Sequence, residues 1–172
     1  MTIDQLIGIM RAAGARSLYA KPLAPNDNSK NQIYLGPDFA ALNILPLKEV
    51  LADAANPQIF KAALNFAWVA DDGTLSAAKD AQVILYPQYP EVRLGSLLRG
   101  SRGAPSAILA SRDQDRVLFL GVKPDGQVLG HLAAQGSQLQ RSFDAAAKVK
   151  QVGVFTALLS LIRFGGRFNY AA

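Results

Sequence analysis

The stretch that most constrains the fold is Tyr19-Ala-Lys-Pro-Leu-Ala-Pro-Asn-Asp-Asn-Ser-Lys-Asn-Gln-Ile-Tyr-Leu-Gly36. Its two ends are typical of a strand over 17–20 and a return strand over 33–35. Between them, residues 25–32 hold seven polar side chains in eight positions, whereas a turn needs only one or two, because Asn and Asp cap their own backbone. Two interpretations stay open: a solvated surface loop, or a projecting arm that reads base edges, a task that suits Asn, Gln and Lys.

The composition indicates a compact globular chain. It has 172 residues, of which half are hydrophobic and 18% are charged, and this suits one domain with a sizeable core. The absence of cysteine excludes disulfides and thiolate metal sites. No apolar run approaches the ~20 residues that cross a bilayer, and the first residues lack the features of a signal peptide. We therefore expect a cytoplasmic protein with no membrane partner.

The net charge of +5 is distributed unevenly along the chain. Residues 38–80 hold three lysines and six acids, whereas residues 93–123 hold six basic residues and two acids. Residues 148–172 hold four basic residues and no acid. Segments dominated by positive charge are typical of a surface that binds a polyanion. The alternative is a solvated surface with no partner.

Hydrophobic periodicity predicts several short strands with helices near the chain ends. Thr2 and Gln5 form a capping-box pattern that begins a helix over 3–13. Further helices are predicted over 38–42, 47–55 and 152–162, the last of them apolar around most of its circumference. Strands are predicted over 17–20, 33–35, 59–69, 82–86, 107–110, 117–122 and 127–132. Many short strands with hairpin signals suit a barrel-like β domain.

Several catalytic arrangements are excluded by the residues present. One histidine, His131, and no cysteine exclude Cys–His dyads and the usual zinc sites, and we interpret His131, like Trp68, as structural. A metal-dependent nuclease of the Pro-Asp…Asp/Glu-x-Lys kind needs carboxylates that hold Mg²⁺ and a nearby lysine. Pro37-Asp38 and Pro124-Asp125 supply the first half, but no Asp-x-Lys or Glu-x-Lys occurs. The chain is therefore interpreted as a binder, not an enzyme, with no catalytic residues, metal site or cofactor of its own.

Two segments resemble a known family. The stretch Lys21-Pro-Leu-Ala-Pro-Asn-Asp27, followed by Asn31-Gln32 and Tyr34-Leu35, resembles the first recognition arm in the amino-terminal domain of the EcoRII restriction endonuclease. Glu91-Val-Arg93, followed by Arg99-Gly and Arg102-Gly, resembles that domain's second arm and the basic stretch after it. The resemblance covers roughly residues 3–132. It has departures, since both arms are shorter, Asn31 stands in place of a histidine, and Val92 stands in place of a lysine.

The resemblance implies a fold, a partner and a role. The fold is mainly β with a few helices: a B3-like, seven-stranded open pseudobarrel with flanking helices, whose two arms grip the major groove. The partner is double-stranded DNA with a CCWGG-type site. The role is targeting or effector recognition within a bacterial type II restriction endonuclease. Residues 1–164 form this domain, and 165–172 begin a linker to a covalently linked nuclease domain, the part that needs Mg²⁺. We expect a monomer.

The resemblance also implies roles for individual residues. Base edges are read by Asn26, Asp27, Asn31, Gln32, Tyr34, Glu91 and Arg93. Phosphates are held by Lys21, Lys30, Arg99 and Arg102.

Two other classes of function stay open on the sequence. The first is a protein-interaction module that docks through the 152–162 helix. The second is an atypical Mg²⁺-dependent nuclease that uses Asp38 or Asp125.

Overall fold

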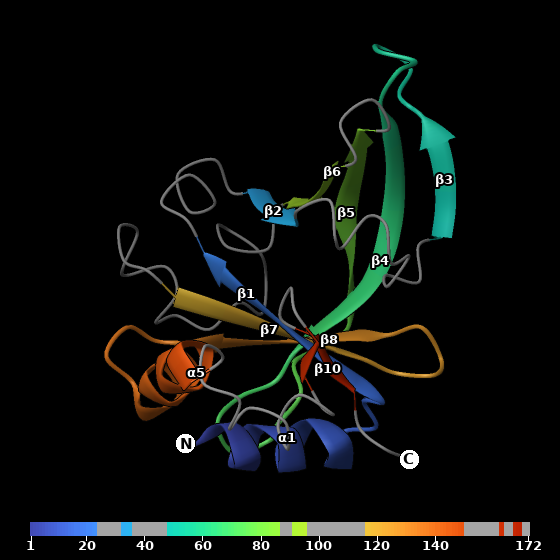
Figure 1. Ribbon diagram of the computed structural model, residues 1–172. Coiled ribbons are helices and arrows are strands. Elements are labelled where there is room, and N and C mark those ends of the chain that lie inside the picture. Colours follow the sequence, from blue (N-terminus) through green and yellow to red (C-terminus); the bar gives the residue numbers. More distant parts are fainter. Residues whose placement is uncertain are drawn as a thin grey trace.

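The computed structural model describes residues 1–23, 32–35, 48–86, 91–95, 116–149, 162–163 and 167–169. Two helices and ten strands lie in these ranges (Figure 1). In chain order they are α1 (Ile3–Ala12), β1 (Ser17–Leu23), β2 (Gln32–Leu35), β3 (Lys48–Ala52), β4 (Phe60–Trp68), β5 (Lys79–Tyr86), β6 (Glu91–Gly95), β7 (Arg116–Val122), β8 (Val128–Ala133), α5 (Gln138–Val149), β9 (Ile162–Arg163) and β10 (Arg167–Asn169).

One sheet joins all the described strands. Seven of them follow a single path in the order β2-β6-β5-β4-β8-β7-β1, β10 and β9 extend it beyond β1, and β3 pairs with β4 beside it. The pairing of β4 with β8 is parallel, and the other described pairs are antiparallel. The mainly β fold class, with a curled seven-strand sheet and helices beside it, is thereby confirmed.

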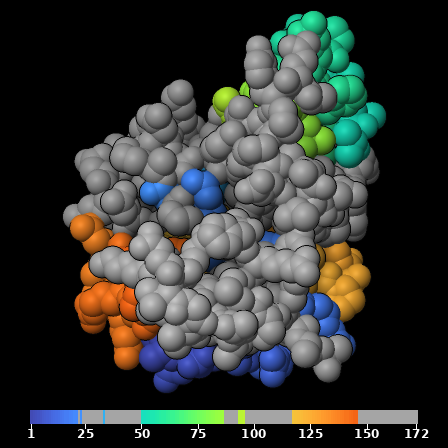
Figure 2. Space-filling view, viewed as in Figure 1, coloured from blue at the N-terminus to red at the C-terminus, as the bar shows by residue number. Residues whose placement is uncertain are grey.

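The sheet curls into two layers (Figure 1). We call β2, β6, β5 and β4 the upper layer and β8, β7 and β1 the lower layer. In Figure 1, α1 and α5 lie beside the lower layer, and the upper layer rises away from them toward the opposite end. Figure 2 shows atoms of β3 and of the neighbouring part of β4, in teal, at the end of the molecule away from α1.

An inner core fills the curl between the two layers. Alternate residues of β4, including Leu64 and Phe66, bury their side chains against Leu118 and Leu120 of β7. The same core takes Val83 from β5 and equivalent buried positions of β1, β2, β6 and β8. Burying one large apolar side chain contributes roughly 1.5–3 kcal/mol, so this core is what holds the curl closed.

A second core lies between the lower layer and the helices. Leu6 and Met10 of α1 are fully buried there, as is Phe119 of β7. The ring of Phe143 in α5 packs edge-on against Phe119, with ring centroids 5.9 Å apart. The predicted capping box at Thr2 begins α1, as expected from the sequence. Both helices therefore pack against the lower layer. The described residues on the outside of the upper layer lie away from them.

The parallel contact between β4 and β8 depends on a glycine. Residues 66–68 of β4 pair with residues 128–130 of β8. A Cβ atom at Gly130 would lie 2.2 Å from Cζ of Phe66 and 3.0 Å from Cζ3 of Trp68. Trp68 is 2% exposed, so its predicted role as a core residue is confirmed. The two aromatic rings therefore occupy space that any side chain at Gly130 would need.

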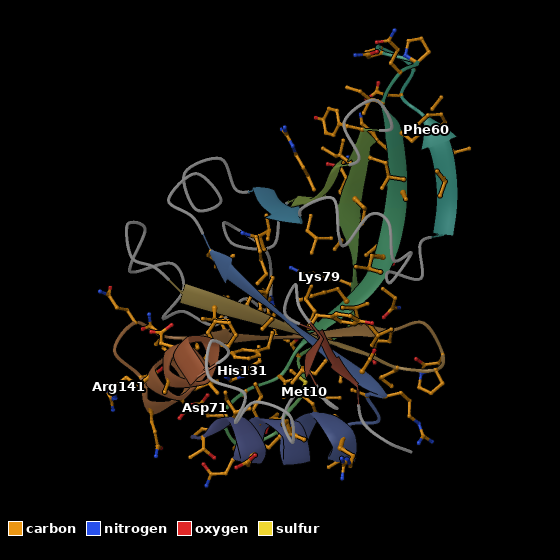
Figure 3. All side chains as sticks on the ribbon, in the orientation of Figure 1. Met10, Phe60, Asp71, Lys79, His131 and Arg141 are labelled. Atoms are coloured by element: carbon orange, nitrogen blue, oxygen red, sulfur yellow. The ribbon has the colours of Figure 1, made fainter. Side chains whose placement is uncertain are left out.

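His131 joins the lower layer to the turn after β4. It is 4% exposed, its Nδ1–H donates to the Val69 carbonyl at 2.9 Å, and its Nε2 lies 3.6 Å from Oδ1 of Asp71 (Figure 3). Burial lowers the pKa of His131, although the Val69 carbonyl and the Asp71 carboxylate act in the opposite direction. These contacts confirm the structural role predicted for this histidine.

The helix predicted over 47–55 was wrong, because residues 48–52 form strand β3. Leu51 pairs with Lys61 and Ala52 with Phe60, with a shift of register between Lys48 and Leu51. The chain then turns through Asp53, whose Oδ1 accepts from the Ala55 N–H at 2.8 Å. Pairing with β4 supplies backbone hydrogen bonds that outweigh the weak local preference for a helix.

The end of the chain also differs from the prediction. Helix α5 was not predicted, although Ser137 and Gln140 form a capping pattern before it, in which the Ser137 hydroxyl accepts from the Gln140 N–H at 3.1 Å. Ile162, the last residue of the predicted helix, lies in β9, and residues 152–161 lie outside the described residues. Residues 167–169, assigned to a linker, form β10 and pair with β1, so this part belongs to the sheet. That a linker leads from this domain to a further domain stays a prediction.

Gly130→Ala is expected to destabilise the protein, because its methyl group would overlap the Phe66 ring. Overpacking of this kind costs typically 1–3 kcal/mol. The matched control is Gly8→Ala on α1, where no atom lies within 4 Å of the new Cβ and helix propensity favours alanine by ~1 kcal/mol. Urea unfolding of both variants measures the difference. Equal stability of Gly130→Ala and the wild type would contradict the close packing of β4 on β8.

His131 is expected to make stability fall at mildly acidic pH. Its pKa is lowered in the folded state, so the unfolded chain binds more protons once the pH drops below the ordinary value of about 6.5. The contribution of neutral His131 to the free energy of unfolding is complete above that pH. It is lost as the pH falls through the folded-state pKa of His131. Urea unfolding at pH 7.5 and 5.5 should show a larger loss for the wild type than for His131→Asn. Equal losses of unfolding free energy in the wild type and in His131→Asn would show that His131 does not cause the pH dependence.

Candidate nucleic-acid interface

The outer face of the upper layer is the side that points away from the inner core. Along β4, β5 and β6, residues alternate between buried inner positions and exposed or half-buried outer positions. The outer positions with described side chains are Lys61, Ala63, Asn65, Asp80, Gln82, Ile84, Tyr86 and Arg93. This face therefore combines amide, aromatic, basic and acidic groups on one sheet.

The register aligns the two predicted reading segments. Tyr34 of β2 lies opposite Arg93 of β6, and Arg93 lies opposite Ile84 of β5. In the next row, Gln32 and Gln82 lie on either side of Gly95. Neighbouring strands lie about 4.8 Å apart, so the backbones of Tyr34 and Arg93 are close even though the residues are distant in the sequence.

Arg93 stacks on an aromatic ring of the same face. Its guanidinium carbon lies 4.6 Å from the centroid of the Tyr86 ring. Tyr86 pairs with Glu91 and is therefore a diagonal neighbour of Arg93, on the side of the β5–β6 chain reversal. A guanidinium that stacks through its face keeps its N–H donors directed outward in its plane. Such an arrangement suits recognition of two acceptors that lie in one plane.

Gln82 lies against Gly95 of β6. A Cβ atom at Gly95 would lie 3.5 Å from Oε1 of Gln82, so the Gln82 amide lies over the β6 backbone. The side chain is exposed. An amide of this kind both donates and accepts, the pattern that pairs with N6 and N7 of adenine.

The second basic residue of the outer face has an acidic partner. The Lys61 ammonium lies 2.5 Å from Oδ2 of Asp53 in the turn after β3. This contact, followed by the Ala55 N–H, lowers the pKa of the Asp53 carboxyl. Lys61 therefore stabilises the local turn, and its charge is matched within the protein.

The structure brings some of the predicted residues together. Gln32, Tyr34, Glu91 and Arg93 lie on the adjacent strands β2 and β6. Lys21 lies on β1 in the lower layer, opposite Leu118, where it is half-buried on the side of the strand that carries Tyr19 and Leu23 into the inner core. The predicted site residues outside the described residues are Asn26, Asp27, Lys30, Asn31, Arg99 and Arg102.

Tyr86 and Gln82 were not predicted as site residues. The alternation in β5, where Ala81, Val83 and Leu85 are apolar, was the available signal, because it places residues 82 and 86 on the opposite face. That signal alone does not show which strand lies beside β5, so the stacking of Tyr86 on Arg93 could not be found from it.

The residues proposed for a rival nuclease site have other contacts or lie outside the described residues. Asp125 sits in the turn between β7 and β8, where Oδ1 accepts from the Gln127 N–H at 3.0 Å and Oδ2 lies 3.2 Å from the Lys123 ammonium. The Gln127 N–H is the main cause of the lowered Asp125 pKa. Asp38 is not among the described residues, and within those no three acidic or histidine side chains converge as metal ligands.

The comparisons with known proteins give a likeness in structure. No protein-family model matches the chain, and no curated protein matches it. Among solved structures, the chain is similar to the B3 domain of the UbaLAI restriction endonuclease, a triple mutant crystallised with cognate DNA. The two are 20% identical, the match covers 84% of this chain and 86% of that chain, and the TM-score is 0.48. Within the described part of the chain, no helix is long and apolar enough to cross a membrane.

Proposed function

We propose that the chain is a sequence-specific domain for double-stranded DNA that reads base edges in the major groove with the outer face of its upper layer. The observation that carries this proposal is the register that places Tyr34 opposite Arg93. Two segments with the side-chain chemistry of base readers, distant in the sequence, lie side by side at one place on the sheet. Core packing alone does not require polar residues of this kind on neighbouring outer positions.

The geometry suits the major groove. That groove is about 12 Å wide. Strands β5 and β6 pair with each other between β4 and β2, so the long side chains on their outer face, and not the strands themselves, reach into the groove. Arginine can donate two hydrogen bonds to O6 and N7 of guanine, and glutamine can pair with N6 and N7 of adenine. Arg93 and Gln82 offer these two groups on adjacent strands of one face.

The charge of the chain supports the same partner. The net charge is +5, and the basic residues concentrate in 93–123 and 148–172. A phosphate backbone attracts such a surface at long range and supplies affinity that does not depend on sequence. The base contacts then select the site.

The proposal also names the target site, the oligomeric state, the parent enzyme and the roles of individual residues. The target is a CCWGG-type site, and the chain is a monomer that acts as the targeting domain of a bacterial type II restriction endonuclease. It needs no cofactor itself, while a covalently linked nuclease domain uses Mg²⁺. The base readers are Asn26, Asp27, Asn31, Gln32, Tyr34, Glu91 and Arg93, and the phosphate contacts are Lys21, Lys30, Arg99 and Arg102.

Arg93→Ala is expected to remove sequence preference more than affinity. A duplex selected from a random pool by the wild type should bind the variant with a loss of ~1–3 kcal/mol, because two donors to one guanine disappear. Binding to a scrambled duplex should change little. Fluorescence anisotropy at fixed salt measures the dissociation constants for the selected and the scrambled duplex. Equal weakening on both duplexes would show that Arg93 contacts phosphate.

Lys30→Ala is the matched control for this experiment. A lysine that holds a phosphate contributes a point charge without reading a base. Both duplexes should therefore bind more weakly by similar factors, and the slope of log K against log salt should become flatter by about one unit.

The isolated chain is expected to bind DNA without cutting it. The sequence lacks Asp-x-Lys and Glu-x-Lys, and Asp125 is held by the turn that contains it. Excess protein incubated with Mg²⁺ and a plasmid that contains CCWGG should leave the supercoiled form intact. Nicking that depends on Mg²⁺ and is lost in Asp38→Ala or Asp125→Ala would overturn this expectation.

A further inference from the structure

The Arg93 guanidinium makes a diagonal contact across the sheet. The residue directly opposite Arg93 is Ile84, whereas the ring on which it stacks belongs to Tyr86, two residues further along β5. Diagonal neighbours have Cα atoms about 7–8 Å apart, a distance that only long or aromatic side chains bridge. The contact of 4.6 Å therefore means that the Arg93 side chain extends along β6 toward the end of the strand that carries Glu91.

The surroundings of this contact favour one orientation. Ile84 and Tyr86 are both half-buried on the outer face, so apolar and aromatic groups flank the Arg93 stem on β5. A guanidinium above an aromatic ring is a favourable arrangement. The 4.6 Å contact therefore restricts the rotamers of Arg93 before any ligand is present.

An arginine that is ordered before binding can favour a base over a phosphate. A flexible arginine loses rotamer freedom when it binds a base, and ordering it beforehand reduces that cost. It also favours a base whose two acceptors lie in the plane of the guanidinium, as O6 and N7 of guanine do. A mobile arginine can instead turn to a phosphate, which carries no sequence information.

We propose that Tyr86 is a specificity-determining positioning residue, which holds the Arg93 guanidinium for a single guanine and keeps it from the phosphate backbone. This inference rests on the proposed function, since it names a residue that acts through Arg93. The ring face provides the effect, so the Tyr86 hydroxyl is not required.

The test is a double-mutant cycle read on two duplexes. Tyr86→Leu should lower the ratio of selected-site to scrambled affinity by about three- to tenfold, the scale of a cation–π contact and of side-chain ordering. Tyr86→Phe should keep that ratio within about twofold, because a phenylalanine ring also attracts a cation. In the Arg93→Ala background, Tyr86→Leu should change nothing further. Arg141→Ala, on α5 and away from the upper layer, is the control cation and should leave the ratio unchanged.

A second measurement does not depend on DNA. The order parameter of the Arg93 Nε–H, measured by NMR without ligand, should be high in the wild type and in Tyr86→Phe and should fall in Tyr86→Leu. Thermal unfolding of each variant confirms that the fold is kept.

The outcomes separate the two proposals. If the wild type does not discriminate between the duplexes, the proposed function fails, and the order parameters still show whether Tyr86 orders Arg93. If the wild type discriminates but Tyr86→Leu has the same effect with and without Arg93, the positioning role is wrong. Unchanged Arg93 order in Tyr86→Leu would overturn it as well.

Discussion

The packing of the Phe66 and Trp68 rings against Gly130 is the constraint on which the rest of the sheet depends. It allows β4 to lie parallel beside β8, and β4 also pairs with β5 and β3. A single strand thus belongs to both layers of the curl. Because the two aromatic rings fill the inner core and leave no space for a side chain at residue 130, the angle between the layers is set by packing.

In the described part of the chain, neither helix covers the outer face of the upper layer. The helices cover the lower layer through the second core, where Met10 and Phe119 are fully buried. The inner core contains the apolar side chains at alternate positions of β4, β5 and β6. Their outer positions can therefore carry Gln82, Tyr86 and Arg93 at little cost to stability. A rigid sheet with recognition groups on one face is a sound basis for reading a ligand, because the groups are ordered before binding.

Local patterns predicted much of this fold. Alternating apolar residues and turn signals identified most of the strands, and the Thr2 capping box identified α1, since these features depend on neighbouring residues alone. Strand β3 was mistaken for a helix because its pairing with β4 decides its structure. Helix α5 was missed even though Ser137 and Gln140 offered a signal. The alignment of Tyr34 with Arg93 is set by how distant strands pair. Residue patterns could suggest that both belong to a site, but they could not show the register or the ring beneath Arg93.

The sharpest test of DNA recognition by the upper layer is an NMR titration of the labelled chain with its selected duplex. The outer-face model predicts that the largest amide shift changes occur in β2, β5 and β6, around Tyr34, Tyr86 and Arg93, while α1 and β8 change little. It also predicts that the same titration with a scrambled duplex leaves Arg93 nearly unaffected at moderate salt. Changes concentrated on α1 and α5, with the upper layer unaffected, would contradict it.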